Sequence, residues 1–370
     1  MGRMKNISRL SALSVAVFLA ACGDEDKAAK AESPLPLPTG KSGPIENISK
    51  EERLKAEDLK PVKDAVDKEI ARFDIEVRGA FEEERFAKLD LLARELRDSK
   101  ALFPDGSWKL DHFYGALNHR SEWTDEAFIA DWNRFVKWID TTPDSKTARI
   151  GLASCFLAYA RMGRGRGTEE EVTAREKALY LERLGMAYDV LMGAKMLPDP
   201  DPCWHEVMAH VAIGQRWSPE KFDELIKEGL DMEPTFWPLT VSRALSLLPT
   251  ALGKEGDWQA YAEKESHRRG GLGDEGYARI VCRMMFHYAD VFRDGHASWP
   301  KTRDGLEILR TKYPDAMDFV NYTARMACMG RDRELAQEMF AQMGDQYSTT
   351  VWRNPENLVH LRNWAETGKW

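Results

Sequence analysis

Basic side chains at helical spacing are the residues of this sequence best suited to bind a ligand. Arg279, Arg283 and His287 follow one another in steps of four, and Asp290 comes three residues later. Steps of three or four place side chains on one face of a helix, which we predict over residues 275–293. Guanidinium groups in such a row can bind a carboxylate through paired hydrogen bonds. The row therefore suggests a site for an acidic ligand, although a solvated helix face has the same spacing.

A second basic cluster lies in a glycine-rich segment, and its members are Arg161, Arg164 and Arg166. A phosphate-binding loop follows a β-strand, whereas this segment follows a helical pattern over residues 147–161. Thr168 and Glu171 have the spacing of a capping box and predict the start of the next helix. We therefore expect a turn between two helices, with arginines that could contact an anion.

His205, Glu206 and His210 invite comparison with a zinc site. Zinc-binding helices carry two histidines at i and i+4, whereas these two are five residues apart and about 140° apart around a helix. We therefore expect no metal ion there. The sequence also lacks the nucleophile-elbow and zinc-protease motifs, so it predicts no catalytic residue and no cofactor.

The N-terminus resembles the signal peptide of bacterial lipoproteins. Residues 3–9 carry three positive charges, and residues 10–21 form an apolar run too short to span a membrane. The run ends in Leu19-Ala20-Ala21-Cys22, which is similar to the lipobox. The resemblance implies cleavage before Cys22 and acylation of its sulfur and new amino terminus. The alternative is an ordinary signal peptide with an incidental cysteine.

This resemblance implies a place in the cell envelope. Several acyl chains on Cys22 would hold the protein durably on a lipid bilayer. Gly23 stands where lipoproteins kept at the inner membrane often have Asp. The outer membrane, facing the periplasm, is therefore the expected location. Four prolines in residues 22–50 favour an extended tether between Cys22 and the folded body.

Composition excludes one class of function. The 370 residues include 43% hydrophobic residues, enough for a sizeable core. The net charge of −8 becomes −11 once the three basic residues of segment 1–21 are removed. An acidic chain of this kind is not expected to bind nucleic acid.

Periodicity predicts an all-α fold. In residues 124–140, Phe128, Trp132, Phe135 and Ile139 form one apolar stripe, and Asp131 lies off it. Segments 203–234 and 315–344 each read as two helices joined by a tight turn, the pattern of tetratricopeptide (TPR) repeats. We therefore predict a signal peptide (1–21), a lipidated tether (22–50), a helical cap (51–145) and a degenerate TPR-like solenoid (146–370).

Three stretches resemble a bacterial family known as domain of unknown function 4034, whose members are regarded as TPR-like. They are Phe103-Pro-Asp-Gly-Ser-Trp-Lys-Leu110, Tyr159-Ala-Arg-Met-Gly-Arg-Gly165, and Leu247-Leu248-Pro249 with the aromatic residues Trp258 and Tyr261. The resemblance covers about residues 80–300. It implies a helical-repeat architecture and no particular activity.

Cysteine and tryptophan give weaker indications. Cys155, Cys282 and Cys328 lie in apolar segments and are expected to be buried thiols, while a periplasmic location would permit a disulfide among these and Cys203. The twelve tryptophans are expected to pack between repeats.

Together these features predict a lipid-anchored protein that binds a protein or peptide partner without catalysis. An envelope hydrolase acting on cell-wall glycan or peptide, or a solute-binding lipoprotein with a cavity lined by tryptophans, is the alternative.

Overall fold

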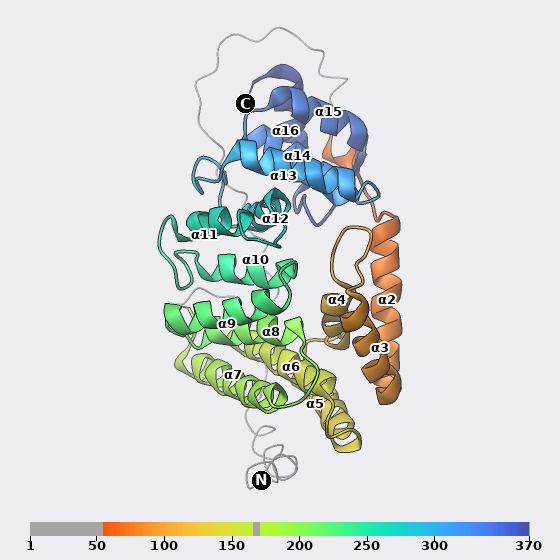
Figure 1. The fold of residues 1–370 in the computed structure, drawn as a ribbon. Coiled ribbons are helices and arrows are strands. Elements are labelled where there is room, and N and C mark those ends of the chain that lie inside the picture. The colour runs from red at the N-terminus through yellow and green to blue at the C-terminus, as the bar shows by residue number, and fades with distance from the viewer. Residues whose placement is uncertain (1–54, 166–170, 370) are drawn as a thin grey trace. The chain divides into compact units, whose positions relative to one another are not determined.

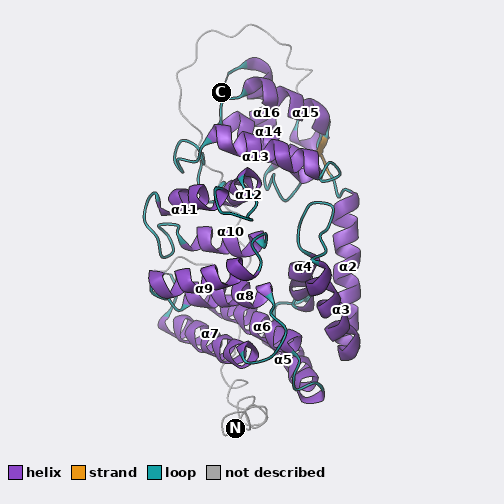
Figure 2. Ribbon diagram, in the orientation of Figure 1, coloured by secondary structure: helices purple, strands orange, loops and turns teal. Residues whose placement is uncertain are grey.

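A computed structural model describes residues 55–165 and 171–369. The predicted signal peptide, Cys22, the whole tether (22–50) and Arg166 lie outside the described residues. Helices are the main elements of the described chain, as Figure 2 shows. The described residues contain fifteen α-helices and one 3₁₀ helix, η2 (Ala56–Asp58). The all-α prediction is therefore confirmed. None of these helices is both long enough and apolar enough to cross a membrane.

Four helices make up the N-terminal part: α2 (Ala65–Glu82), α3 (Phe86–Ser99), α4 (Lys109–Leu117) and α5 (Asp125–Thr141). Helix α5 follows the prediction, and its Phe128 and Phe135 are fully buried. The placement of Asp131 off the apolar stripe is wrong. Its side chain is buried because it accepts hydrogen bonds from Arg78 of α2 and from Arg120.

The middle of the chain contains α6 (Lys146–Arg164), α7 (Ala174–Lys195), α8 (Pro202–Gly214), α9 (Pro219–Met232), α10 (Trp237–Ser246) and α11 (Asp257–Ser266). Thr168 lies outside the described residues, and α7 begins at Ala174, so the capping box predicted with Glu171 does not begin this helix. Thr173 and Glu176 form its capping box instead. Helices α8 and α9 confirm the helix–turn–helix predicted over 203–234.

The C-terminal helices are α12 (Asp274–Met284), α13 (Trp299–Lys312), α14 (Met317–Met329), α15 (Arg333–Met343) and α16 (Pro355–Thr367). Helices α14 and α15 confirm the pair predicted over 315–344. The single helix predicted over 275–293 is wrong in length, since α12 ends at Met284. A turn follows in which the Asp290 carboxylate accepts hydrogen bonds from the backbone of Phe292 and Arg293, at 3.0 and 3.1 Å.

The first described residues are fastened to the end of the chain. Strand β1 (Lys60–Pro61) pairs in parallel with β2 (Gln346–Tyr347). Lys60 also forms a 2.6 Å ion pair with Asp345, and the Asp64 carboxylate accepts a 3.0 Å hydrogen bond from the backbone of Met317. Residues that are far apart in sequence thus close the described fold.

Neighbouring helices from α6 to α16 pack on one another in chain order, and α2, α3 and α4 lie along one side of them (Figure 1). Helix α4 contacts both α6 and α8. The buried apolar residues form two clusters, one reaching from Val77 to Leu239 and one dominated by residues 241–365. Leu59 and Val66 belong to the second cluster, so the N-terminal segment contributes to both.

A buried carboxylate joins the N-terminal helices to α8. Asp201 caps α8 by accepting a 2.9 Å hydrogen bond from the backbone of Cys203. Its other oxygen accepts a 2.7 Å bond from the hydroxyl of Tyr114 and a 3.0 Å bond from Arg97. Helices α3, α4 and α8 therefore meet at one side chain, which is 2% exposed.

We predict that Asp201→Ala lowers the free energy of unfolding by about 3 kcal/mol, because it leaves Arg97 and the Tyr114 hydroxyl without their buried partner. Urea unfolding followed by circular dichroism measures the change. Asp199→Asn is the matched control: Asp199 is exposed two residues away, and its substitution should cost less than about 0.5 kcal/mol. Equal losses in the two variants would contradict this role of Asp201.

Candidate ligand-binding site

A groove of about 790 Å³ lies between the end of α6, the start of α7, the α8–α9 turn and the segment after α10. Arg161 and Arg164 line it, so two members of the second predicted cluster share one concave surface. Lys177 of α7 and Arg216 of the α8–α9 turn add two more cationic side chains. The sequence pattern did not indicate these two, because they come from other elements.

The apolar part of the groove depends on a close approach between α7 and α8. Leu181 is 46% exposed on α7, and Ile213 lies opposite on α8. A side-chain carbon added at Gly214 would come within 2.4 Å of Leu184 and 2.6 Å of the Tyr180 hydroxyl. Glycine at this position therefore lets the two helices meet and sets the width of the groove.

The positive charge of Arg161 affects the pKa of Glu206, one of the three residues compared above with a zinc site. Glu206 forms a 2.7 Å ion pair with His210, whereas Nε2 of His205 lies 3.7 Å from a carboxylate oxygen of Glu228. Burial by itself would raise the pKa of Glu206, but the charges of His210 and Arg161 outweigh burial and lower that pKa. Within the described ranges, no three His, Cys, Asp or Glu side chains gather as a metal site would require.

Asp111 of α4 faces this ion pair and was not indicated by the sequence. Burial and the negative charge of Glu206 raise the pKa of Asp111 to about 7. The Ser242 hydroxyl lies 3.5 Å from Glu206 and 3.5 Å from His210. Both Ser242 and Glu206 approach the same ring nitrogen, Nε2, so His210 cannot relay a proton between them as in a Ser-His-acid triad.

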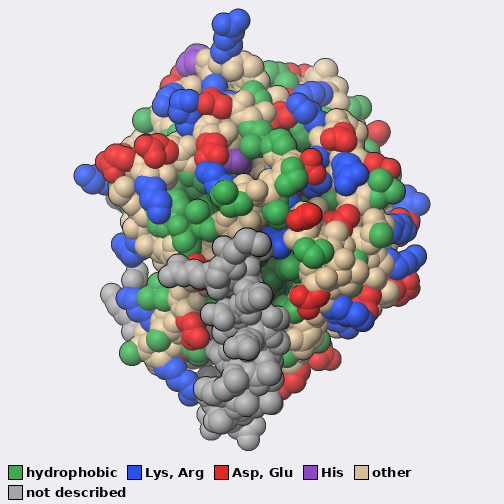
Figure 3. All heavy atoms as spheres, turned by 60° about the horizontal axis from the view of Figure 1, so that its bottom comes forward, with side chains coloured by type: hydrophobic (Ala, Val, Ile, Leu, Met, Phe, Trp, Pro, Cys, Tyr) green, Lys and Arg blue, Asp and Glu red, His purple; other side chains and the backbone are tan. Residues whose placement is uncertain are grey.

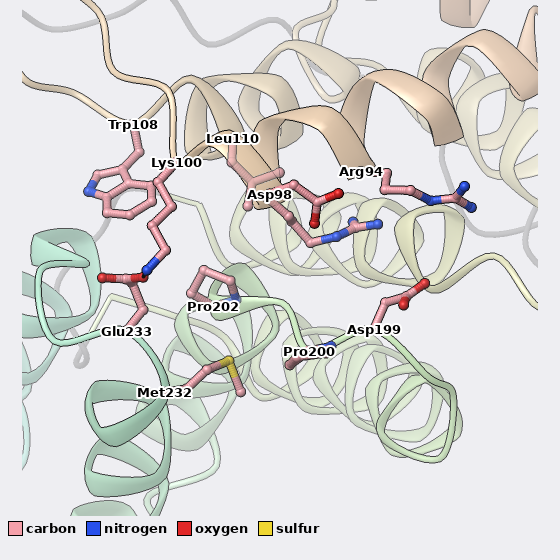
Figure 4. Close-up of a pocket in the computed structure, with 11 residues that line it drawn as sticks. Arg94, Asp98, Lys100, Trp108, Leu110, Asp199, Pro200, Pro202, Met232 and Glu233 are labelled. Atoms are coloured by element: carbon pink, nitrogen blue, oxygen red, sulfur yellow. Dashed lines mark ion pairs between the residues drawn. The ribbon is translucent and has the colours of Figure 1, made fainter.

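A smaller cavity of about 290 Å³ opens between α3, the start of α4 and the segment leading into α8 (Figure 4). Lys100 reaches across it to form a 2.6 Å ion pair with Glu233, and Arg97 is bound to Asp201. Trp108 is the only tryptophan among its described lining residues. The cavity thus lacks the several tryptophans expected of the solute-binding alternative.

The row Arg279, Arg283, His287 is divided: Arg279 is held apart, whereas the charge of Arg283 still lowers the pKa of His287. Arg279 is buried, forms a 3.1 Å ion pair with Glu275 and donates a hydrogen bond to the backbone carbonyl of Asp105. It therefore holds the α3–α4 loop in place. Arg283 is exposed at the end of α12, and His287 lies in the turn beyond it because the helix stops at Met284.

The cysteines and most tryptophans serve the core. Cys155, Cys203, Cys282 and Cys328 are buried and unpaired in the structure. Burial raises the pKa of the Cys155 and Cys282 thiols to about 12, which disfavours the reactive thiolate. Trp138, Trp258 and Trp352 are fully buried, as the packing interpretation predicts, whereas Trp123 is 59% exposed.

Acidic and basic side chains alternate on the face that Figure 3 presents, with hydrophobic side chains between them. Comparisons with known proteins add no further guide: no protein family, no curated protein and no solved structure matches this chain. The resemblance to domain of unknown function 4034 therefore stays a prediction.

We predict that the contribution of Asp111 to stability falls as pH rises from about 4 to about 7, because only the folded chain keeps a proton on Asp111 across that range. Asp111→Asn cannot lose this proton, so the variant should gain at least about 1 kcal/mol relative to the parent between pH 5 and pH 8. Urea unfolding at both pH values tests this. The exposed Asp98→Asn is the control, and the same pH response in all three chains would refute the assignment.

Proposed function

We propose that this protein is a lipid-anchored lipoprotein of the bacterial envelope whose helical body binds an acidic segment of a protein or peptide. The observation that carries the proposal is the groove in which Arg161, Arg164, Lys177 and Arg216 adjoin apolar side chains. Cationic groups along an open groove attract carboxylates, and the apolar residues add contact area.

The helix pairs support a TPR-like interpretation of the body. Helices α8 and α9 pack as a pair joined by a short turn, and α14 and α15 form another pair of similar length. In helical-repeat proteins each pair buries its apolar faces against its neighbours and leaves grooves for extended partners. The degenerate solenoid is part of this proposal, and the paired packing is its support.

The membrane anchor is proposed from the sequence alone. The positive N-terminus, the apolar run and Leu19-Ala20-Ala21-Cys22 support it. With the outer membrane as the expected location, residues 22–50 would let the body stand off the bilayer on the periplasmic side.

We predict that Cys22→Ala abolishes incorporation of labelled palmitate, because it removes the thiol and the amino terminus that would be acylated. Cells are grown with tracer palmitate, and the chain is immunoprecipitated and counted. Cys203→Ala is the matched control and should keep the label, since Cys203 is buried in α8. Label that persists without Cys22 would rule out the anchor.

For the groove, we predict that the full chain binds a fluorescent peptide of about eight glutamates and that Arg161→Glu weakens binding about tenfold, or 1.4 kcal/mol. Arg161 is exposed, so the change should leave the fold intact. Fluorescence anisotropy at low salt measures the affinity, which added salt should reduce. Arg72→Glu, an exposed change on α2, is the control. No binding, or equal loss in both variants, would reject the acidic-segment proposal.

A hydrolase is the second candidate, and Asp111 favours it. A carboxyl group with a pKa of about 7 beside an ionised Glu206 is an arrangement used for general acid and base catalysis. It ranks second because neither Asp111 nor Glu206 lines the two cavities described above.

A further inference from the structure

Arg325 of α14 is a buried cation with no carboxylate partner in the described chain. It is 8% exposed, and its guanidinium donates a 2.7 Å hydrogen bond to the backbone carbonyl of Val351. Burial and the positive charge of Arg353 together lower the pKa of Arg325 to about 10, against the opposing effect of Tyr322. A buried charge without a counter-charge is costly, so this position calls for an explanation.

The other buried arginines are compensated. The described residues contain six buried arginines, and four of them form ion pairs: Arg120, Arg183, Arg243 and Arg279. For the fifth, Arg149, the negative charge of Asp144 favours the charged form and works to raise the pKa. Arg325 differs from all five, because the side chains whose charges shift its pKa are Tyr322 and Arg353, and neither of these is a carboxylate.

Arg353 lies near Arg325, and two further basic side chains, Arg283 and His287, come from α12 and the turn after it. The guanidinium carbons of Arg325 and Arg353 lie 5.5 and 4.4 Å from the centre of one ring, that of Phe286. His287 directly follows Phe286 in the chain, and the charges of Arg283 and Arg353 both lower the pKa of His287, so these four side chains form one cluster drawn from α12, the following turn, α14 and the segment before α16. No ion pair joins any of the three arginines to an acid in the described part of the chain.

Asp318 is an acidic group close to this cluster, since its charge affects the pKa of Tyr322 together with the charges of Arg283 and Arg325. Burial raises the pKa of Asp318 to about 6. A hydrogen bond with Ser348 works to lower this pKa, and the negative charges of other aspartates work to raise it. An ion pair with an arginine would lower that pKa instead. Asp318 therefore does not neutralise the cluster.

We propose that Arg283, Arg325, Arg353 and His287 form a binding site for a phosphate-type dianion. Three positive charges without an ion-pair partner in the described chain favour a ligand that carries two negative charges over a single carboxylate. Planar guanidinium groups also match the oxygens of phosphate with paired hydrogen bonds. The exposed Arg283 and Arg353 would meet the ligand first, and the buried Arg325 would supply charge from behind.

This site goes beyond the peptide groove, because it uses different helices and a different ligand chemistry. Two sources could present the same group: free phosphate or a soluble phosphomonoester, and a lipid headgroup that ends in a phosphomonoester. The site would combine its charges with the Phe286 and Trp352 rings that hold the guanidinium groups in place.

The test is calorimetric titration of the full chain with inorganic phosphate, at an ionic strength held constant with sodium chloride. We expect binding to the parent and a loss of at least about tenfold in affinity in the double variant Arg283→Gln, Arg353→Gln. Both side chains are exposed, and thermal unfolding without phosphate verifies that the variant folds. Arg72→Gln is the control and should bind like the parent.

A second titration uses dihexanoyl phosphatidate as a soluble lipid monomer. Tighter binding than inorganic phosphate would support the site and assign it to a lipid headgroup, whereas binding of phosphate alone would support it for a soluble ligand. The proposal is overturned if neither compound binds, or if the double variant binds them as the parent does. Failure of the glutamate peptide to bind would leave this result unaffected.

Discussion

The carboxylate of Asp201 is the contact on which the arrangement of the N-terminal helices depends. It begins α8 as a cap and at the same time holds Arg97 of α3 and Tyr114 of α4. A buried carboxylate is stable only when donors satisfy it, so α8 and the two N-terminal helices must be in place together. This coupling makes the packing of α2 to α4 against the later helices part of the fold rather than an addition to it.

The same N-terminal region occupies a surface that the sequence assigned to a ligand. The α3–α4 loop lies against Arg279 and Trp237, and the Trp237 ring nitrogen donates a 3.1 Å hydrogen bond to the carbonyl of Gly106. Gly106 has a φ of +73°, and a side-chain carbon there would meet Tyr313 at 2.3 Å. Arg279 thus binds the protein's own backbone. An extended partner would have to use the groove at α6 to α8 instead.

Local patterns in the sequence predicted the helices well, because Pro and Gly mark most of their ends and apolar periodicity marks their faces. The end of α12 was missed because apolar residues such as Tyr288 and Phe292 continue to pack after the helix stops. The buried roles of Asp131 and Asp111 were missed for a related reason. Partners such as Arg78 and Glu206 lie on other helices, and a single sequence does not reveal which distant residues meet.

Charge compensation separates structural cations from candidate binding residues better than spacing does. Arg279 and Arg283 are four residues apart and look equivalent in the sequence. Arg279 forms an ion pair with Glu275, whereas Arg283 forms no ion pair within the described chain. Selection for stability alone would favour a neutral side chain in place of the unpaired Arg325. Its burial beside Arg353 is the feature that the proposed anion site accounts for.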